Sequence, residues 1–217
     1  MIKMIHKLKS KKGFTLVELI VVIAIIGVLA AILVPTMLGM VTKSRVTTAN
    51  STAASIQKST NAFFVQADAS GYGMRPGVYD EFKIRVYDNA GVITWECSAG
   101  TSNHFFSSNG TKIVWGNTGT FQAGSSLAGV TGGESRLCAY LYDAFPDIKQ
   151  AAIIIVVSSG KCTLTAFTEE INTILPTTEY PNPVNGMPPA SYVWNGKTEG
   201  ISPGGIIVGT APAIPMN

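Results

Sequence analysis

Charge is scarce in this sequence of 217 residues, and histidine and cysteine are scarcer. Charged residues make up 13% of the chain and apolar residues 46%, which is little charge for an ordinary soluble domain. The sequence has no CxxC, no HExxH and no phosphate-binding glycine loop. A Ser-His-Asp triad beyond the basic N-terminus would have to use His104, which has no nucleophile-elbow sequence near it. We therefore expect no enzyme, no cofactor and no metal.

Positive charge is also in short supply outside the first thirteen residues. That segment holds Lys3, Lys7, Lys9, Lys11 and Lys12. Setting these five aside reduces the sixteen Lys and Arg to eleven, against thirteen Asp and Glu, so the rest of the chain is slightly acidic. A nucleic-acid partner would need basic residues clustered on a folded face, so none is expected.

The three cysteines, Cys97, Cys138 and Cys162, all lie in the second half of the chain. If that half is exported, one disulfide and one leftover thiol can form, and the sequence does not choose among the three pairs. Three free, buried thiols fit the sequence equally well, because cysteine packs as a small hydrophobe. The pairing stays open at this point.

The apolar excess is concentrated in the run from Phe14 to Val34, which only Thr15 and Glu18 interrupt. At about 1.5 Å per residue this run spans roughly the 30 Å hydrocarbon layer of a membrane. It is too long for the apolar core of an ordinary secretory signal. The lysines before it predict a cytoplasmic N-terminus and an external C-terminal body.

Glu18 is an acidic residue inside this apolar run, where a carboxylate costs a few kcal/mol. The run has no basic side chain, so the missing partner could be a new N-terminal amine if the chain were cut before Phe14. Gly13 has no side chain, which lets a protease approach that bond. A protonated Glu18 in a plain anchor is the alternative, and these arguments do not choose between the two.

The sequence from Lys11 to Ile20, KKGFTLVELI, resembles the prepilin leader and cleavage motif of type IV pilins and related pseudopilins. The match includes the basic leader, the glycine before the cut, the phenylalanine after it and a glutamate four positions further on. Pro35 also falls where that family has a helix-interrupting proline. The resemblance covers roughly residues 1–60 and implies the pilin fold.

The resemblance implies that a prepilin peptidase removes residues 1–13 by cutting between Gly13 and Phe14, and then N-methylates Phe14. It also implies that Glu18 attracts the Phe14 amine of a neighbouring subunit during assembly. The implied partners are prepilin peptidase, the pilus assembly platform in the membrane, and the same or other pilins bound through the N-terminal helices. The implied location is the cytoplasmic membrane for the single-pass precursor, with its head outside, and then a cell-surface pilus.

Helical periodicity continues beyond the apolar run. One stripe recurs at steps of three and four residues, at Val46, Ala49, Ala53, Ile56, Thr60, Phe63 and Ala67. Gly71-Tyr72-Gly73 then supplies a stop signal. We expect one helix from Phe14 to about Ala67, divided into an apolar part over 14–41 and an amphipathic part over 42–70. Pro35 predicts a kink or local melting because it lacks an amide hydrogen, although membrane helices also carry prolines without such a role.

Residues 71–175 are expected to form an α+β head, an antiparallel sheet packed on the amphipathic half of the long helix. Predicted strands cover Phe82–Val86, Val92–Cys97, Lys112–Trp115, Ala151–Val157 and Cys162–Phe167. Turns are predicted at Asp88–Gly91 and Ser158–Lys161, and a short helix over Glu134–Phe145. Residues 176–217 are rich in proline and glycine and are expected to be a loop-rich extension that partly pairs with the sheet.

These patterns favour a structural subunit of an extracellular type IV pilus. A pseudopilin of a type II secretion system or a competence-type pilin is the alternative within the same class. An uncleaved, single-pass membrane-anchored domain that binds a ligand or acts as an enzyme is the alternative from another class.

Overall fold

The structure is a computed structural model of the 217-residue chain. It describes residues 13–98, 104–106, 115–116, 118–126, 130, 132–170, 182–183, 192–193 and 198–214. The basic segment 1–12 and residues 112–114 of one predicted strand lie outside the described residues. The chain forms two compact units, Met1–Lys43 and Ser44–Asn217.

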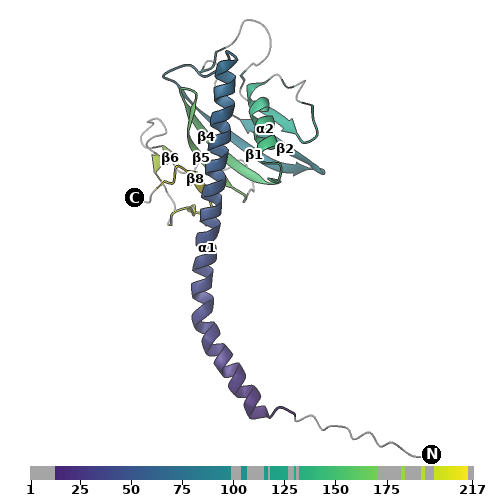
Figure 1. Cartoon of the computed structure of the whole chain (residues 1–217), viewed down its shortest axis with the longest axis vertical. Helices are drawn as coiled ribbons and strands as arrows, with labels where there is room; N and C mark the ends of the chain where they lie inside the picture. Colours follow the sequence, from purple (N-terminus) through teal and green to yellow (C-terminus); the bar gives the residue numbers. More distant parts are fainter. Residues whose placement is uncertain are drawn as a thin grey trace, which may run out of the picture. The chain divides into compact units, whose positions relative to one another are not determined.

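The first element is a single long helix, α1, which spans Leu16–Ala69 (Figure 1). It ends in a Schellman motif. The amide of Gly71, whose φ is 80°, donates to the Asp68 carbonyl, and the amide of Tyr72 donates to the Ala67 carbonyl. Glycine suits this position because its missing β-carbon permits a positive φ. The predicted long helix and its glycine stop are therefore confirmed.

The amphipathic half of α1 buries the predicted stripe. Its buried residues are Ala49, Ala53, Ile56, Thr60, Phe63, Phe64 and Ala67. Val46 is only half-buried, and Phe64 is an addition that the stripe did not include. Phe64 stacks on Trp115, and Trp115 stacks in turn on Phe105 with 4.0 Å between ring centroids. Trp115 was expected to end a strand, but it lies in no strand and belongs to this aromatic cluster.

Six strands form one antiparallel sheet in the order β3-β2-β1-β4-β5-β8. The helix α2 lies on the same face of this sheet as α1 (Figure 1). The element bounds are β1 Tyr79–Asn89, β2 Val92–Ser98, β3 Thr118–Gln122, α2 Gly133–Ala144, β4 Ala151–Ser158, β5 Lys161–Thr168, β6 Asn182–Pro183, β7 Tyr192–Val193 and β8 Gly209–Ala211. Strands β6 and β7 pair with each other only. The α+β arrangement of a long N-terminal helix and an antiparallel sheet is pilin-like, as expected.

Two tight turns join the central strands. Ala90 and Gly91 connect β1 to β2 with φ values of 53° and 87°, and Ser159 and Gly160 connect β4 to β5 with 49° and 78°. Positive φ at both central residues marks a type I′ turn, whose twist matches that of paired strands. Both predicted hairpins are therefore confirmed.

The sheet is covered on both faces over β4 and β5. One face packs against α1 and α2 in the main core. The other face carries a second cluster of Ile154, Val156, Leu164, Ala166, Val208 and Ile214. This double coverage explains why β4 has a continuous apolar sequence instead of alternation. The last two members come from the C-terminal extension, which also adds β8 to the sheet edge as expected.

Candidate functional site

The bond predicted to be cut lies just outside α1. Gly13, Phe14 and Thr15 are not helical, and α1 begins at Leu16. Gly13 has nothing near the place where a β-carbon would stand, and the Phe14 side chain is 83% exposed. A protease would therefore meet exposed, non-helical backbone at the Gly13–Phe14 bond, as cleavage requires.

Glu18 completes a capping box at the start of α1. Its carboxylate accepts hydrogen bonds from the Thr15 amide at 2.9 Å and from the Thr15 hydroxyl at 2.8 Å. The Thr15 hydroxyl accepts in turn from the Glu18 amide at 3.3 Å. Such reciprocal bonds satisfy amide groups that a helix start leaves without partners. The pattern Thr-x-x-Glu was the signal for this role, and the sequence argument missed it.

Large apolar side chains are exposed all along the first part of α1. Every described residue from Gly13 to Val41 is exposed, including Leu16, Ile20 and Met40. Within α1 the mean hydropathy over 18 residues reaches 3.1, which by length and composition suits a membrane-crossing helix near the N-terminus. So much apolar surface needs lipid or other protein around it.

Pro35 lies inside α1, and the helix continues through it. The Thr36 hydroxyl donates to the Leu33 carbonyl at 2.9 Å one turn earlier. Proline removes the amide that would bond to the Ala31 carbonyl, which weakens this turn. A kink or local melting at Pro35 in an assembled filament stays a prediction.

Three amide side chains fasten the amphipathic half of α1 to the head. Asn50 accepts a hydrogen bond from the Thr210 amide at 2.8 Å, and Gln57 donates to the Ala211 carbonyl at 2.9 Å. Asn61 accepts from the Cys162 amide at 2.8 Å. The predicted stripe of α1 does not include these three residues. Their place beside the buried stripe was the available signal, since an amide can bond the edge of a sheet.

Gly209→Ala is expected to destabilise the head, because an added β-carbon there would collide with the backbone of Ala49 and Asn50 in α1. Overpacking of this kind costs about 1–3 kcal/mol, which corresponds to a fall of roughly 5 °C in the melting temperature of a chain this size. Thermal unfolding of the full chain in detergent, followed by circular dichroism, measures the effect. Gly116→Ala is the control, since nothing lies near its added β-carbon; equal melting temperatures for the two variants would contradict the close approach.

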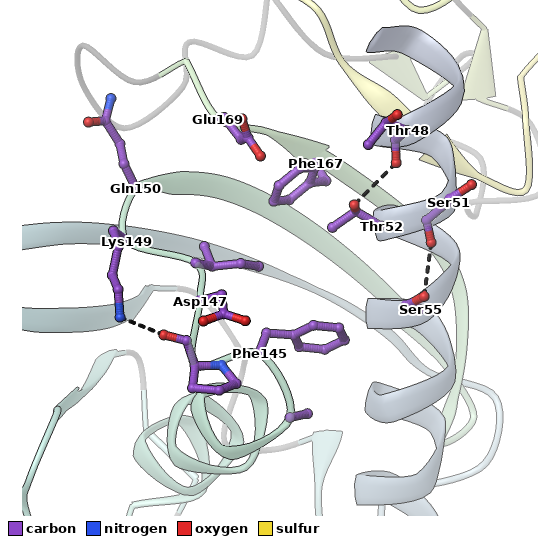
Figure 2. Close-up of a pocket in the computed structure, with 13 residues that line it drawn as sticks. Thr48, Ser51, Thr52, Ser55, Phe145, Asp147, Lys149, Gln150, Phe167 and Glu169 are labelled. Carbon is purple, nitrogen blue, oxygen red and sulfur yellow. Dashed lines mark hydrogen bonds between the residues drawn. The ribbon is translucent and has the colours of Figure 1, made fainter. Parts of the chain in front are cut away.

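The head also has an open groove of about 720 Å³ between α1 and the loop that follows α2 (Figure 2). Hydroxyl groups line its α1 side, but those of Thr48, Thr52 and Ser55 donate to carbonyls of their own helix. The Lys149 ammonium donates to the Pro146 carbonyl at 2.7 Å. Three hydroxyls of the groove are therefore already hydrogen-bonded within α1, and its described lining contains no histidine or cysteine.

Two acidic groups in the head are buried. Asp80 lies 3.1 Å from the Nδ1 atom of His104, and a Glu134 oxygen accepts from the Gly116 amide at 2.8 Å. Burial raises the pKa of Glu134. In the part of the chain that is described, no hydroxyl or thiol hydrogen-bonds to the His104 ring, and no group of three His, Cys, Asp or Glu side chains could hold a metal. Among the described residues, the Asp80–His104 pair therefore has no hydroxyl or thiol beside it that could act as the nucleophile of a triad.

The three cysteines are free and buried in the structure. Cys97 in β2 lies beside Cys138 in α2. The Cys162 thiol contacts the Thr165 hydroxyl at 3.3 Å and the Leu164 carbonyl at 3.4 Å within β5. The structure thus brings two of the three predicted candidates together.

Comparison with known families identifies one match. A model of the prokaryotic N-terminal methylation motif matches residues 8–34, which include the Gly13–Phe14 bond and Glu18. The comparisons with curated proteins and with solved structures gave no significant match. Proteins with this motif are structural rather than catalytic, and the motif implies processing by prepilin peptidase and assembly with other pilins. The chain therefore carries the class III signal peptide of type IV pilins within residues 8–34, together with a long apolar helix and an antiparallel sheet in a pilin-like arrangement.

Proposed function

We propose that this chain is a non-enzymatic structural subunit of an extracellular type IV pilus, with the Ser44–Asn217 unit displayed as its head. The observation that carries the proposal is the coincidence of the methylation motif with the start of α1. The matched residues include Gly13, Phe14 and Glu18, and the part of α1 that follows Glu18, up to Val41, is exposed and predominantly apolar, which supports the proposal.

The apolar half of α1 suits transfer from membrane to filament. Its side chains are as well accommodated by neighbouring helices as by lipid tails, since both surroundings are apolar. Little apolar surface therefore has to meet water when the subunit leaves the membrane. The free energy of extraction stays modest, and specific contacts between subunits can then decide the direction of transfer.

Glu18 provides such a specific contact in the proposed filament. After a cut before Phe14, the new amine would stay positively charged, even when N-methylated. A carboxylate in apolar surroundings is stabilised strongly by an opposite charge close to it. The capping box holds the Glu18 carboxylate at the first turn of α1, beside Thr15, where the amine of a neighbouring subunit would have to reach it.

Two measurements on one sample test this function. Filaments sheared from the cell surface are purified and imaged, and the mass of the N-terminal peptide of this chain in them is determined. The expected result is surface filaments that contain the chain, with N-methylated Phe14 as its first residue.

Results that differ from this expectation would each support a different function. The processed chain found only in short periplasmic or wall-spanning assemblies would contradict a pilus subunit and favour a pseudopilin of type II secretion or a competence-type pilin. An intact Met1 would contradict both and favour the uncleaved, membrane-anchored domain.

A further inference from the structure

We propose that Cys97 and Cys138 form a disulfide that fastens α2 to the sheet, and that Cys162 remains a thiol. The inference rests on the proposed function in one respect only, namely that the head is exported to an oxidising compartment. The pairing itself follows from the packing of α2 on β2 and β3.

The register of the sheet places Cys97 beneath the first turns of α2. Cys97 pairs directly with Gly119 of β3, so that their side-chain positions share one face about 5 Å apart. A β-carbon added at Gly119 would meet the Ser135 amide and the β-carbon of Glu134, both at the start of α2. The start of α2 therefore rests on β3 right beside Cys97.

Cys138 lies one helical turn after Glu134 and Ser135, the two residues of α2 that approach Gly119. Residues three and four apart on a helix are neighbours on one face, about 5–6 Å apart between β-carbons. Cys138 thus shares a helix face with Ser135 and Glu134, and both Cys97 and Cys138 are fully buried in the same core. The Cys138 side chain is also close enough to raise the pKa of the Cys97 thiol. A disulfide needs β-carbons about 3.5–4.5 Å apart, a separation that two neighbouring side chains on facing elements of one core can reach.

The alternative pairs are separated by the sheet order. Strands β2 and β5 have β1 and β4 between them, so Cys97 and Cys162 belong to strands roughly 14 Å apart. Helix α2 packs on β2 and β3, which puts Cys138 on the same side of the sheet as Cys97 and away from β5.

The oxidation is a two-electron thiol–disulfide exchange. One cysteine thiolate attacks a disulfide of an exported thiol oxidoreductase, or of oxidised glutathione, and forms a mixed disulfide. The second cysteine thiolate attacks the mixed disulfide and releases the oxidant's sulfur. The products are the Cys97–Cys138 bond and two thiols, either the dithiol of the oxidoreductase or two molecules of glutathione, which carry the two electrons and two protons. Contact with Cys138 and burial raise the pKa of the Cys97 thiol well above its usual value in the folded head. The exchange is therefore expected during folding, before α2 closes over Cys97.

The test uses the full-length chain from membranes and surface filaments, quenched in acid and alkylated in denaturant. Without reductant, one cysteine should be alkylated, and after reduction all three; peptide mass spectrometry should find Cys97 joined to Cys138. Cys162→Ala is the matched control and should keep the linked peptide. The linked chain closes a loop of about 40 residues, so reduction should lower its melting temperature by on the order of 10 °C.

A second experiment tests the cysteine pairing independently of whether the head is exported. The purified, reduced chain is folded in detergent with oxidised glutathione, and it should form the same linked peptide. Failure of this experiment, or a link through Cys162, overturns the pairing whatever the cell does with the protein. A chain from filaments that begins at Phe14 yet has three alkylatable cysteines overturns the inference and leaves the proposed function standing. A chain that links in detergent but retains Met1 and three thiols in cells contradicts the export and hence the proposed function.

Discussion

Glu18→Ala is expected to leave membrane insertion and cleavage intact while reducing the yield of surface filaments at least about tenfold. In the proposed filament, the alanine variant would leave the amine of a neighbouring subunit without a partner in apolar surroundings. An unpaired buried charge of this kind costs about 3–5 kcal/mol, and 1.4 kcal/mol already corresponds to a factor of ten. Quantifying this chain in sheared filaments and in membranes, by immunoblot of both fractions, measures the effect.

The capping box makes a second variant necessary, because Glu18→Ala also removes the bonds to Thr15. Glu18→Gln keeps an acceptor oxygen for the Thr15 amide and hydroxyl but has no charge. If the charge is what matters, the glutamine variant should assemble as poorly as the alanine variant. Normal filament yield in Glu18→Gln would show that Glu18 acts as a helix cap and would remove the charge pair from the mechanism.

Gly13→Leu is expected to block processing and leave the precursor in the membrane. Gly13 is exposed and the helix begins only at Leu16, so a bulky side chain would meet the protease itself and no part of the fold. The processed band should fall below about a tenth of its normal abundance, since a loss of 1.4 kcal/mol in transition-state binding lowers the rate tenfold. Immunoblots that resolve precursor from mature chain provide the measurement.

Ser10→Leu is the matched control for this experiment. It adds the same side chain to the leader at three residues' distance from the bond, and its processing should stay close to normal. A mature band of normal abundance in Gly13→Leu would contradict the assigned cleavage bond. Loss of processing in both variants would instead show that the protease is sensitive to a leucine anywhere in the leader, and not specifically at the cleavage bond.

The sequence alone predicted those parts of the fold whose signal is local. The helical stripe that ends at Ala67, the alternating strand around Ile84 and the turn residues of both hairpins all depend on neighbours a few positions away. In each case the local preference agrees with the burial that the complete head provides. The same applies to α2, whose observed bounds differ from the predicted ones by one residue at each end.

The missed features depend on segments that are far apart in the chain. The strand β3 contains Gly119 and little apolar pattern, and its place follows from pairing with β2 and from the start of α2. The strand β8 has three residues. It pairs with β5, and its backbone is hydrogen-bonded to amide side chains of α1 that lie about 150 residues earlier in the chain. A sequence shows which side chains can bond but not which distant backbone meets them. The contact between Cys97 and Cys138 was open for the same reason.

In the candidate functional sites, too, the residues of local motifs were predicted and the features formed by distant segments were not. Gly13, Phe14 and Glu18 were found from a short, continuous motif, and the family comparison covers the same residues. The bonds between Thr15 and Glu18 were also within reach, because a capping box is itself a local pattern. The groove in the head had no signal in the sequence, since α1, the loop after α2 and β5 each contribute to it.

The attachment of α1 to the head has a consequence for how freely the head can vary. Asn50, Gln57 and Asn61 bond to the peptide backbone of their partners and to none of their side chains. A new side chain in β8 that keeps the backbone in place therefore leaves these bonds unchanged. The helix can therefore keep these three amides while side chains of the sheet that point away from it change, whereas Gly209 is fixed as glycine because α1 leaves no room there for a β-carbon.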